Sequence, residues 1–160
     1  MGKKTGPNPT DRGKKGTKRS LLVEAAGIPL SAFAEAANVN DMCLVGANLL
    51  ELDDLPVRRP SPRRFRQGMC MDKGYDYPEI RALVRMYGFT PHIRSRGEER
   101  KSMQRRRGYR PRRWVVGRTH SWYNRFRDLL IRWCKKEENY TAQLHLASAV
   151  IIGSFIGLSG

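Results

Sequence analysis

Asp72 is the residue of this chain best placed to do chemistry, because it directly follows a short apolar segment, residues 67–71, that is predicted to be a strand. Sites tend to form where loops leave the C-terminal ends of strands in an open sheet. A carboxylate there can bind Mg²⁺, but one carboxylate alone makes a weak site, since Mg²⁺ is usually held by one or two carboxylates together with substrate phosphates. On the residues alone, we favour the structural alternative, in which Asp72 caps the turn after the strand.

A second candidate segment is a predicted helix from about Arg113 to Lys136, in which arginines are interleaved with aromatic residues. Arg113, Gly117 and Asn124 are separated by four and seven residues and therefore share one helical face. In the functional interpretation, Arg118 and Arg125 contact phosphates, and aromatic side chains such as Trp122 stack on unpaired bases.

The same helix has a structural interpretation. A 3–4 spacing predicts a face turned toward the core, which we favour for Phe126, Leu129, Leu130 and Trp133. His120 could contact DNA or a metal, but a lone histidine on a helix is more often structural. For Trp122 the two interpretations are evenly balanced.

The charge of the chain is strongly positive and is distributed in blocks. The net charge is +16, which favours a polyanionic partner and makes nucleic acid the first candidate. Residues 21–57 carry six acids and no Lys or Arg, whereas residues 94–136 carry sixteen Lys and Arg against three acids. We expect phosphate contacts from the basic loop 94–112 and from Lys14, Lys15, Lys18 and Arg19, with solvated basic segments as the alternative.

The elements that would position these residues alternate between strands and helices. Residues 20–23 and 28–33 predict a hairpin around Gly27, although the Ala-rich segment 32–37 could be helical. Further elements follow: a helix from Asn40 or Asp41 to about Leu52, the strand 67–71, a helix between Pro78 and Gly88, a strand 89–93, the helix 113–136 and a last helix from near Asn139. This order predicts a mixed α/β sheet flanked by helices.

Other classes of protein fit less well. Cys43, Cys70 and Cys134 are far apart, so neither a disulfide framework nor a zinc site is indicated, and a reducing cytoplasm is expected. The basic N-terminus lacks the apolar core of a secretory signal. Residues 144–158 are apolar for about fifteen residues, short of the roughly 20 needed to span a bilayer, so a buried terminal helix is favoured over a membrane helix.

Three motifs occur in an order that resembles the DDE-type insertion-sequence transposases. The segment Gly-Pro-Asn-Pro-Thr-Asp-Arg-Gly-Lys-Lys-Gly-Thr-Lys-Arg begins at Gly6, and Cys-Met-Asp-Lys-Gly-Tyr-Asp ends at Asp76. The third runs from Trp114 to Phe126 and resembles the last catalytic helix of the family, whose pattern is Arg-Trp-Val-Val-Glu-Arg-Thr-His-Ser-Trp. Gly117 stands where that pattern has its metal-binding glutamate.

The resemblance implies an RNase H-like catalytic domain with three acids that hold Mg²⁺ or Mn²⁺ for DNA cleavage and strand transfer. Asp72 corresponds to the second acid, and Arg113 and Asn124 to positions that contact DNA. The first acid of the family lies on an opening strand upstream of the segment that begins here at Gly6. We therefore expect a C-terminal fragment with an incomplete core, divided into a basic segment 1–19, a partial α/β core 20–93, the loop 94–112 and helices 113–160.

The leading hypothesis is a transposase fragment that binds transposon ends and target DNA but is catalytically impaired. The alternative is a basic DNA-binding regulator, which inhibits an intact transposase by occupying its DNA or by pairing with it. An upstream reading frame could restore the first acid but not the third. Homodimerisation is also compatible with the sequence, and a small basic membrane protein is the weakest option.

Overall fold

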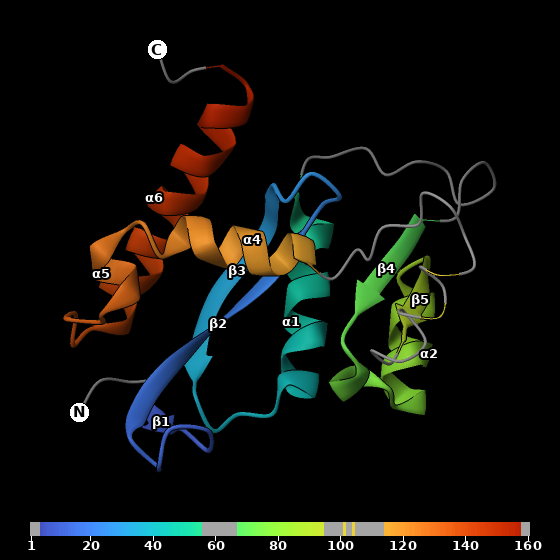
Figure 1. Cartoon of the computed structure of the whole chain (residues 1–160), viewed down its shortest axis with the longest axis horizontal. Helices are drawn as coiled ribbons and strands as arrows, with labels where there is room; N and C mark the ends of the chain where they lie inside the picture. Colours follow the sequence, from blue (N-terminus) through green and yellow to red (C-terminus); the bar gives the residue numbers. More distant parts are fainter. Residues whose placement is uncertain (1–3, 56–66, 95–100, 102–103, 105–113, 158–160) are drawn as a thin grey trace. The chain divides into compact units, whose positions relative to one another are not determined.

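The computed structural model describes residues 4–55, 67–94, 101, 104 and 114–157. The chain divides into two compact units, one formed by residues 1–40 and 115–160 and the other by residues 41–114 (Figure 1). Each unit combines strands with helices, so the predicted mixed α/β class is confirmed. Within the described ranges the strands form two sheets, however, and not the single mixed sheet that the alternation predicts.

The first unit is built on a three-stranded antiparallel sheet of order β1-β2-β3. Its strands are β1 (Gly6–Pro7), β2 (Lys15–Val23) and β3 (Pro29–Ala36). The predicted hairpin is confirmed, and Gly27 adopts a φ of 90° in its turn, a conformation that residues with a side chain rarely adopt. The helical alternative for residues 32–37 is wrong, because Ala32 and Ala34 alternate along β3 and turn the same side of the strand toward the core.

Three helices complete this unit: α4 (Trp114–Tyr123), α5 (Arg127–Leu130) and α6 (Glu137–Phe155). The prediction of one continuous helix from 113 to 136 is wrong, because a turn at residues 124–126 separates α4 from α5. The predicted core face of this helix is correct only in part. Leu129 is buried and Phe126 packs against the core. Leu130 and Trp133 are 56% and 71% exposed, so they do not belong to the core. The last predicted helix is confirmed as α6, with Glu137 and Glu138 in its first turn, where acids are favourable.

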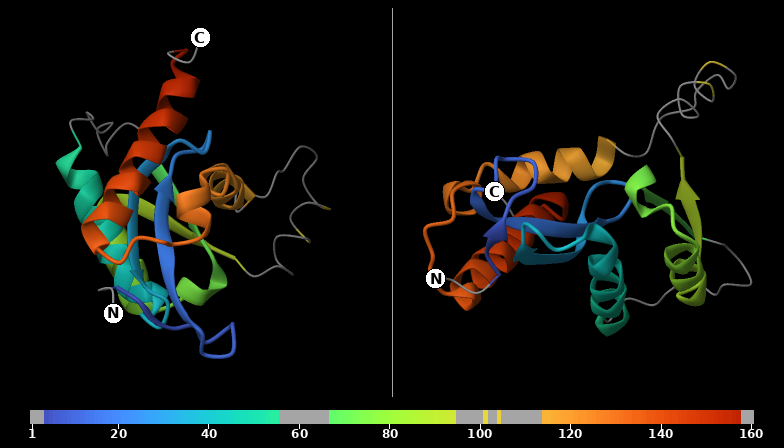
Figure 2. Two further views of the ribbon diagram at one scale, coloured as in Figure 1. Left: turned by 90° about the vertical axis from the view of Figure 1, so that its left-hand side faces the viewer. Right: turned by 90° about the horizontal axis from the view of Figure 1, so that it is seen from below.

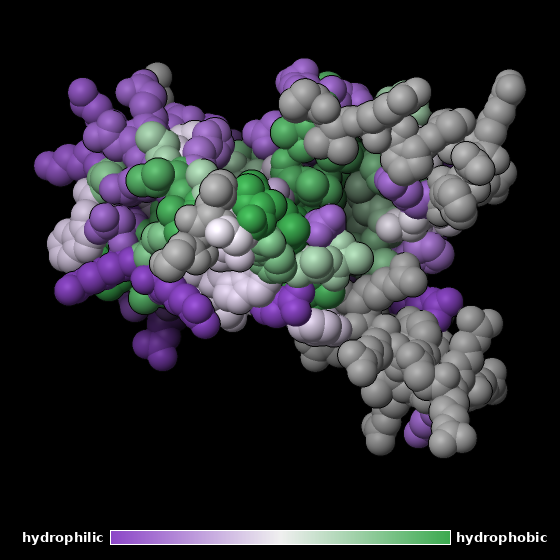
Figure 3. All heavy atoms as spheres, turned by 90° about the horizontal axis from the view of Figure 1, so that it is seen from above, coloured by the Kyte–Doolittle hydropathy of each residue, from purple (hydrophilic) through white to green (hydrophobic). Residues whose placement is uncertain are grey.

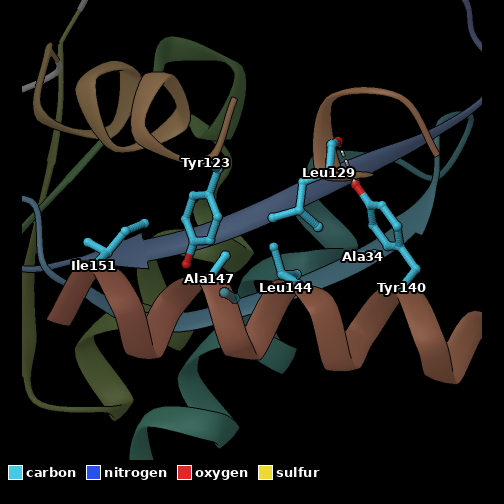
Figure 4. Packing of buried hydrophobic residues seen from close by; sticks show 8 residues of the cluster. Ala34, Tyr123, Leu129, Tyr140, Leu144, Ala147 and Ile151 are labelled. Carbon is cyan, nitrogen blue, oxygen red and sulfur yellow. Dashed lines mark hydrogen bonds between the residues drawn. The ribbon is translucent and has the colours of Figure 1, made fainter. Parts of the chain in front are cut away.

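The core of the first unit lies between β3 and the C-terminal helices. Tyr123 of α4 and Leu129 of α5 point toward α6, which contributes Tyr140, Leu144, Ala147 and Ile151 (Figure 4). The Tyr140 hydroxyl donates to the Leu129 carbonyl at 3.2 Å. The alanines of β3 allow α6 to approach the strand closely, and α6 lies along the hairpin in both further views (Figure 2). This packing fixes α4, the helix that carries Gly117.

The second unit contains α1 (Asp41–Asp54), β4 (Gln67–Met71), the short 3₁₀ helix η1 (Lys73–Tyr75), α2 (Pro78–Met86) and β5 (Phe89–Ile93). These bounds confirm the predicted helices and strands of this region. Strands β4 and β5 pair in parallel, and α2 connects them. Pro78 opens α2, and Gly88 follows its end with a φ of 83°. The arrangement places Asp72 immediately after β4, at its C-terminal end.

Candidate functional site

Asp72 caps η1, as the structural interpretation of the sequence predicts. Its side chain is exposed, and its Oδ1 accepts a hydrogen bond of 2.6 Å from the Lys73 backbone N–H. Asp76, the next acid of the same motif, is engaged by two cations. Lys73 and Arg81 both donate to its carboxylate, with 2.7 Å between Arg81 Nε and Asp76 Oδ1. These hydrogen bonds hold the pKa of Asp76 below its usual range, so this carboxylate supports the loop.

The negative charge of Asp41 affects the same tyrosine, Tyr75, as the negative charge of Asp72. Burial first, and then the negative charges of Asp41 and Asp72, raise the pKa of Tyr75 to about 12. Asp41, at the start of α1, therefore lies within electrostatic range of the phenol that Asp72 also affects. The sequence marked Asp41 only as a helix cap, because nothing in the residue spacing brings the start of α1 near η1.

These acids do not form a complete metal centre. Across the ranges 4–55, 67–94 and 114–157, no three His, Cys, Asp or Glu side chains are arranged so that they could hold a metal ion. Gly117 adds no ligand. It lies exposed in α4, and a Cβ built on it would meet no atom within 4 Å. A side-chain Cβ therefore fits at position 117 without moving the described atoms around it.

Four of the predicted DNA-contacting residues come from β2 and from the C-terminal half of α4 or just beyond it. Arg19 of β2 donates through Nη2 to Oδ1 of Asn124, and its guanidinium carbon lies 5.9 Å from the centre of the Tyr123 ring. His120 lies one turn before Asn124. Burial, together with the positive charge of Arg19, lowers the pKa of His120. The structure thus brings Arg19, His120 and Asn124 together, with Trp122 on the same helix.

Arg118 and Trp122 fasten α4 to the hairpin turn. Arg118 donates to the carbonyl of Ala26, and its guanidinium carbon lies 4.9 Å from the centre of the Trp122 ring. Thr119, which is fully buried, donates to the carbonyl of Gly27 at 2.8 Å. Trp122 also packs edge-to-face on Phe155, with 5.4 Å between ring centres. These contacts favour a structural role for Trp122 over stacking on unpaired bases.

The remaining predicted DNA-contacting residues differ in exposure. Lys14 is exposed and forms a 3.8 Å ion pair with Asp11, and Lys15 and Arg125 are exposed as well. Lys18 is half-buried and donates to the Val39 carbonyl. Arg113 and most of the loop 94–112 lie outside the described residues. In the view from above, both hydrophilic and apolar side chains reach the surface (Figure 3), and the exposed apolar ones include Trp114, Leu130 and Trp133.

The described residues contain no helix long and apolar enough to cross a bilayer.

Comparison with known proteins gave two matches. A family model described as "Transposase DDE domain" matches residues 69–152, which include Asp72 and Gly117. A transposase for the insertion sequence element IS402 of Burkholderia cepacia is 39% identical over 152 residues, which is 92% of this chain and 68% of that relative. No solved structure matches the chain significantly.

Proposed function

The chain belongs to the DDE-type insertion-sequence transposases, and we propose that it is a member that binds DNA but cannot cut or join it unaided. The proposal rests on the glycine at position 117. It stands in the catalytic helix at the place where the family pattern has an acid, and its environment is empty and solvent-exposed. A glycine there offers no oxygen to a metal ion.

Divalent metal ions are the usual cofactors of this family. When two such ions are bound, they activate the attacking oxygen and stabilise the leaving oxygen of a phosphodiester. In this chain Asp72 is the retained acid that would hold a metal, and Asp41 is another carboxylate whose charge acts on the Tyr75 phenol. Asp72 already accepts a hydrogen bond from the Lys73 backbone, and the described residues supply no third ligand. The donor set of the described residues therefore does not fit the family's metal site.

The core proposed for the chain is RNase H-like. In such a core the opening strand is a sheet neighbour of the hairpin and carries the first acid. The short β1, which pairs with β2 at the edge of the hairpin, contains only Gly6 and Pro7 and has no acid. The first acid would have to come from an upstream segment or from an intact transposase.

DNA binding is supported by charge and exposure together. Lys14, Lys15 and Arg125 are exposed, and the net charge of +16 would attract the phosphate backbone regardless of sequence. Such binding weakens steeply with salt, because each neutralised phosphate releases condensed counterions. We expect a linear fall of log K with log salt for the chain on duplex DNA of any sequence.

A nicking assay tests the loss of activity. The purified chain is incubated with Mg²⁺ or Mn²⁺ and a supercoiled plasmid that carries its element's ends, with Asp72→Ala as the matched variant. We expect no nicking above background by either protein. Cleavage by the unaltered chain that disappears in Asp72→Ala would show that the retained acid still works and that the proposal is wrong.

A further inference from the structure

Arg19 is a basic residue of the first unit with a guanidinium nitrogen that is buried and forms no hydrogen bond. Nη2 donates to Asn124, but Nη1 is inaccessible to solvent and forms no hydrogen bond. Within the part of the chain that the structure describes, no carboxylate pairs with Arg19, whereas Lys4 pairs with Glu137 at 2.9 Å. Arg19 is therefore a half-buried cation without a counter-ion.

Two other partly buried cations of this unit, Arg132 and Lys18, bond to acceptors of the protein. Arg132 donates to the carbonyls of Cys134 and Lys4 at 3.1 and 3.2 Å and also to the hydroxyl of Thr17. Lys18 donates to the carbonyl of Val39. Partial burial of a basic side chain in this fold is thus normally accompanied by backbone acceptors, and Arg19 departs from that pattern.

A buried donor without an acceptor lowers the stability of the folded state by about 1–3 kcal/mol, and by more when it is charged. Such a donor in a native structure therefore needs an explanation, and a bound ion is one of them. The surroundings of Arg19 favour an anion. Because Asn124 uses its Oδ1 to accept from Arg19, its amide nitrogen remains the donor side of that group, and Asn124 is exposed. His120 adds a ring N–H from one turn earlier on the same helical face.

We propose that Arg19, Asn124 and His120 form a binding site for one phosphate group of the DNA backbone, on the face of α4 that carries Gly117. The inference rests on the proposed DNA binding and gives it a location. The fork of a guanidinium matches two oxygens of a phosphate. Asn124 accepts from Nη2 of Arg19, and binding of a phosphate would require the Arg19 side chain to turn so that its buried Nη1 reaches the surface. The remaining exposed lysines would contribute only diffuse attraction.

The salt dependence of DNA binding provides the first test. Fluorescence anisotropy with a labelled duplex gives the slope of log K against log salt for the unaltered chain and for Arg19→Gln. Loss of one phosphate contact should reduce the magnitude of the slope by about one. Arg81→Gln, which removes the same charge from a residue already paired with Asp76, should leave the slope unchanged. Arg19→Lys should keep most of the slope and bind more weakly.

His120 provides a second test that does not depend on DNA. A bound anion favours the protonated imidazole, so inorganic phosphate should raise the pKa of His120 in an NMR titration, relative to chloride at equal ionic strength. Arg19 is the charged group that affects this imidazole, and Arg19→Gln should abolish the response to phosphate. His120→Gln identifies the resonance among the three histidines of the chain.

The outcomes separate the two proposals. Failure of the unaltered chain to bind any DNA would overturn the proposed function, while a phosphate-dependent shift at His120 would still establish the anion site. DNA binding with the same slope in a folded Arg19→Gln chain, or a His120 pKa that ignores phosphate, would overturn the inference. A shift seen with free phosphate but no slope change would show that the site binds the small ion and not the DNA backbone.

Discussion

Replacement of Gly117 gives a stability change whose sign follows directly from the structure. A glycine inside a helix is less favourable than alanine by about 0.8–1 kcal/mol, because it loses more backbone freedom on folding. Gly117 is the fourth residue of α4, and its Cβ position is empty to 4 Å, so no clash offsets this gain. We expect Gly117→Ala to stabilise the chain by about 1 kcal/mol, or roughly 2–4 °C in Tm for a domain of this size.

Thermal melts followed by circular dichroism, with urea titrations beside them, measure this change. Gly46→Ala is a matched control in α1, since its Cβ would meet only Leu83 Cδ2 at 3.9 Å, an ordinary contact. Both variants should melt higher than the unaltered chain. A lower melting point for Gly117→Ala alone would show that something occupies the space beside Gly117 and that the reasoning is wrong.

Gly117→Glu extends the same prediction to chemistry. Glutamate is also a better helix former than glycine, and the open environment admits its side chain. On our proposal the chain lacks the family's first acid, so a carboxylate at position 117 alone should not complete a metal site, and we expect a stabilised chain that does not nick the plasmid in Mg²⁺. Metal-dependent nicking by Gly117→Glu would mean that two acids suffice or that another carboxylate of the chain completes the site.

Two further predictions concern the contacts of α4. Gly27→Ala should destabilise the chain, because position 27 has a φ of 90° and a Cβ there would lie 2.9 Å from Arg118 Nη2; a melting temperature equal to that of the unaltered chain would contradict the docking of the turn on α4. The pH dependence of unfolding should show the buried imidazole of His120. Burial, and then the charge of Arg19, lower its folded pKa below the unfolded value of 6.5, so the unfolded chain binds the proton more readily. Stability is therefore complete above about pH 6.5 and declines as the pH falls from there toward the folded pKa. His120→Gln should lack this decline in urea titrations at pH 5–7, and an identical decline in the variant would refute the assignment.

Short-range patterns predicted most of the local structure. Pro78 and Gly88 bound α2 as expected, and Gly27 forms the turn of the β2–β3 hairpin, because the backbone preferences of proline and glycine act within a few residues. The continuous helix 113–136 was wrong for the opposite reason. The 3–4 spacing of apolar residues continues past residue 124, but the chain turns at residues 124–126. After this turn, Leu129 is held by a tertiary contact with Tyr140, which the local spacing does not reveal.

The candidate site was predicted less completely than the elements. Asp72 falls at the strand end where the sequence places it, and the cap that it forms was the favoured interpretation. The contact between Arg19 and Asn124 joins residues 105 positions apart, so no local pattern could indicate it. The proximity of Asp41 and Tyr75 likewise depends on how α1 packs near η1, which the spacing of apolar residues does not determine.

The same contacts change how the charge of the chain should be interpreted. The sequence suggests that its many cations all face a polyanion, yet Lys18, Arg118 and Arg132 each bind backbone carbonyls of their own unit. An arginine that donates to a carbonyl keeps its charge but has fewer donors to offer a phosphate, so it adds to long-range attraction more than to contacts. The number of phosphates that the first unit neutralises should therefore be well below its number of basic residues. Arg19 differs from these three because its guanidinium bonds to the side chain of Asn124 and not to a backbone carbonyl, and its Nη1 is a donor that a phosphate could satisfy.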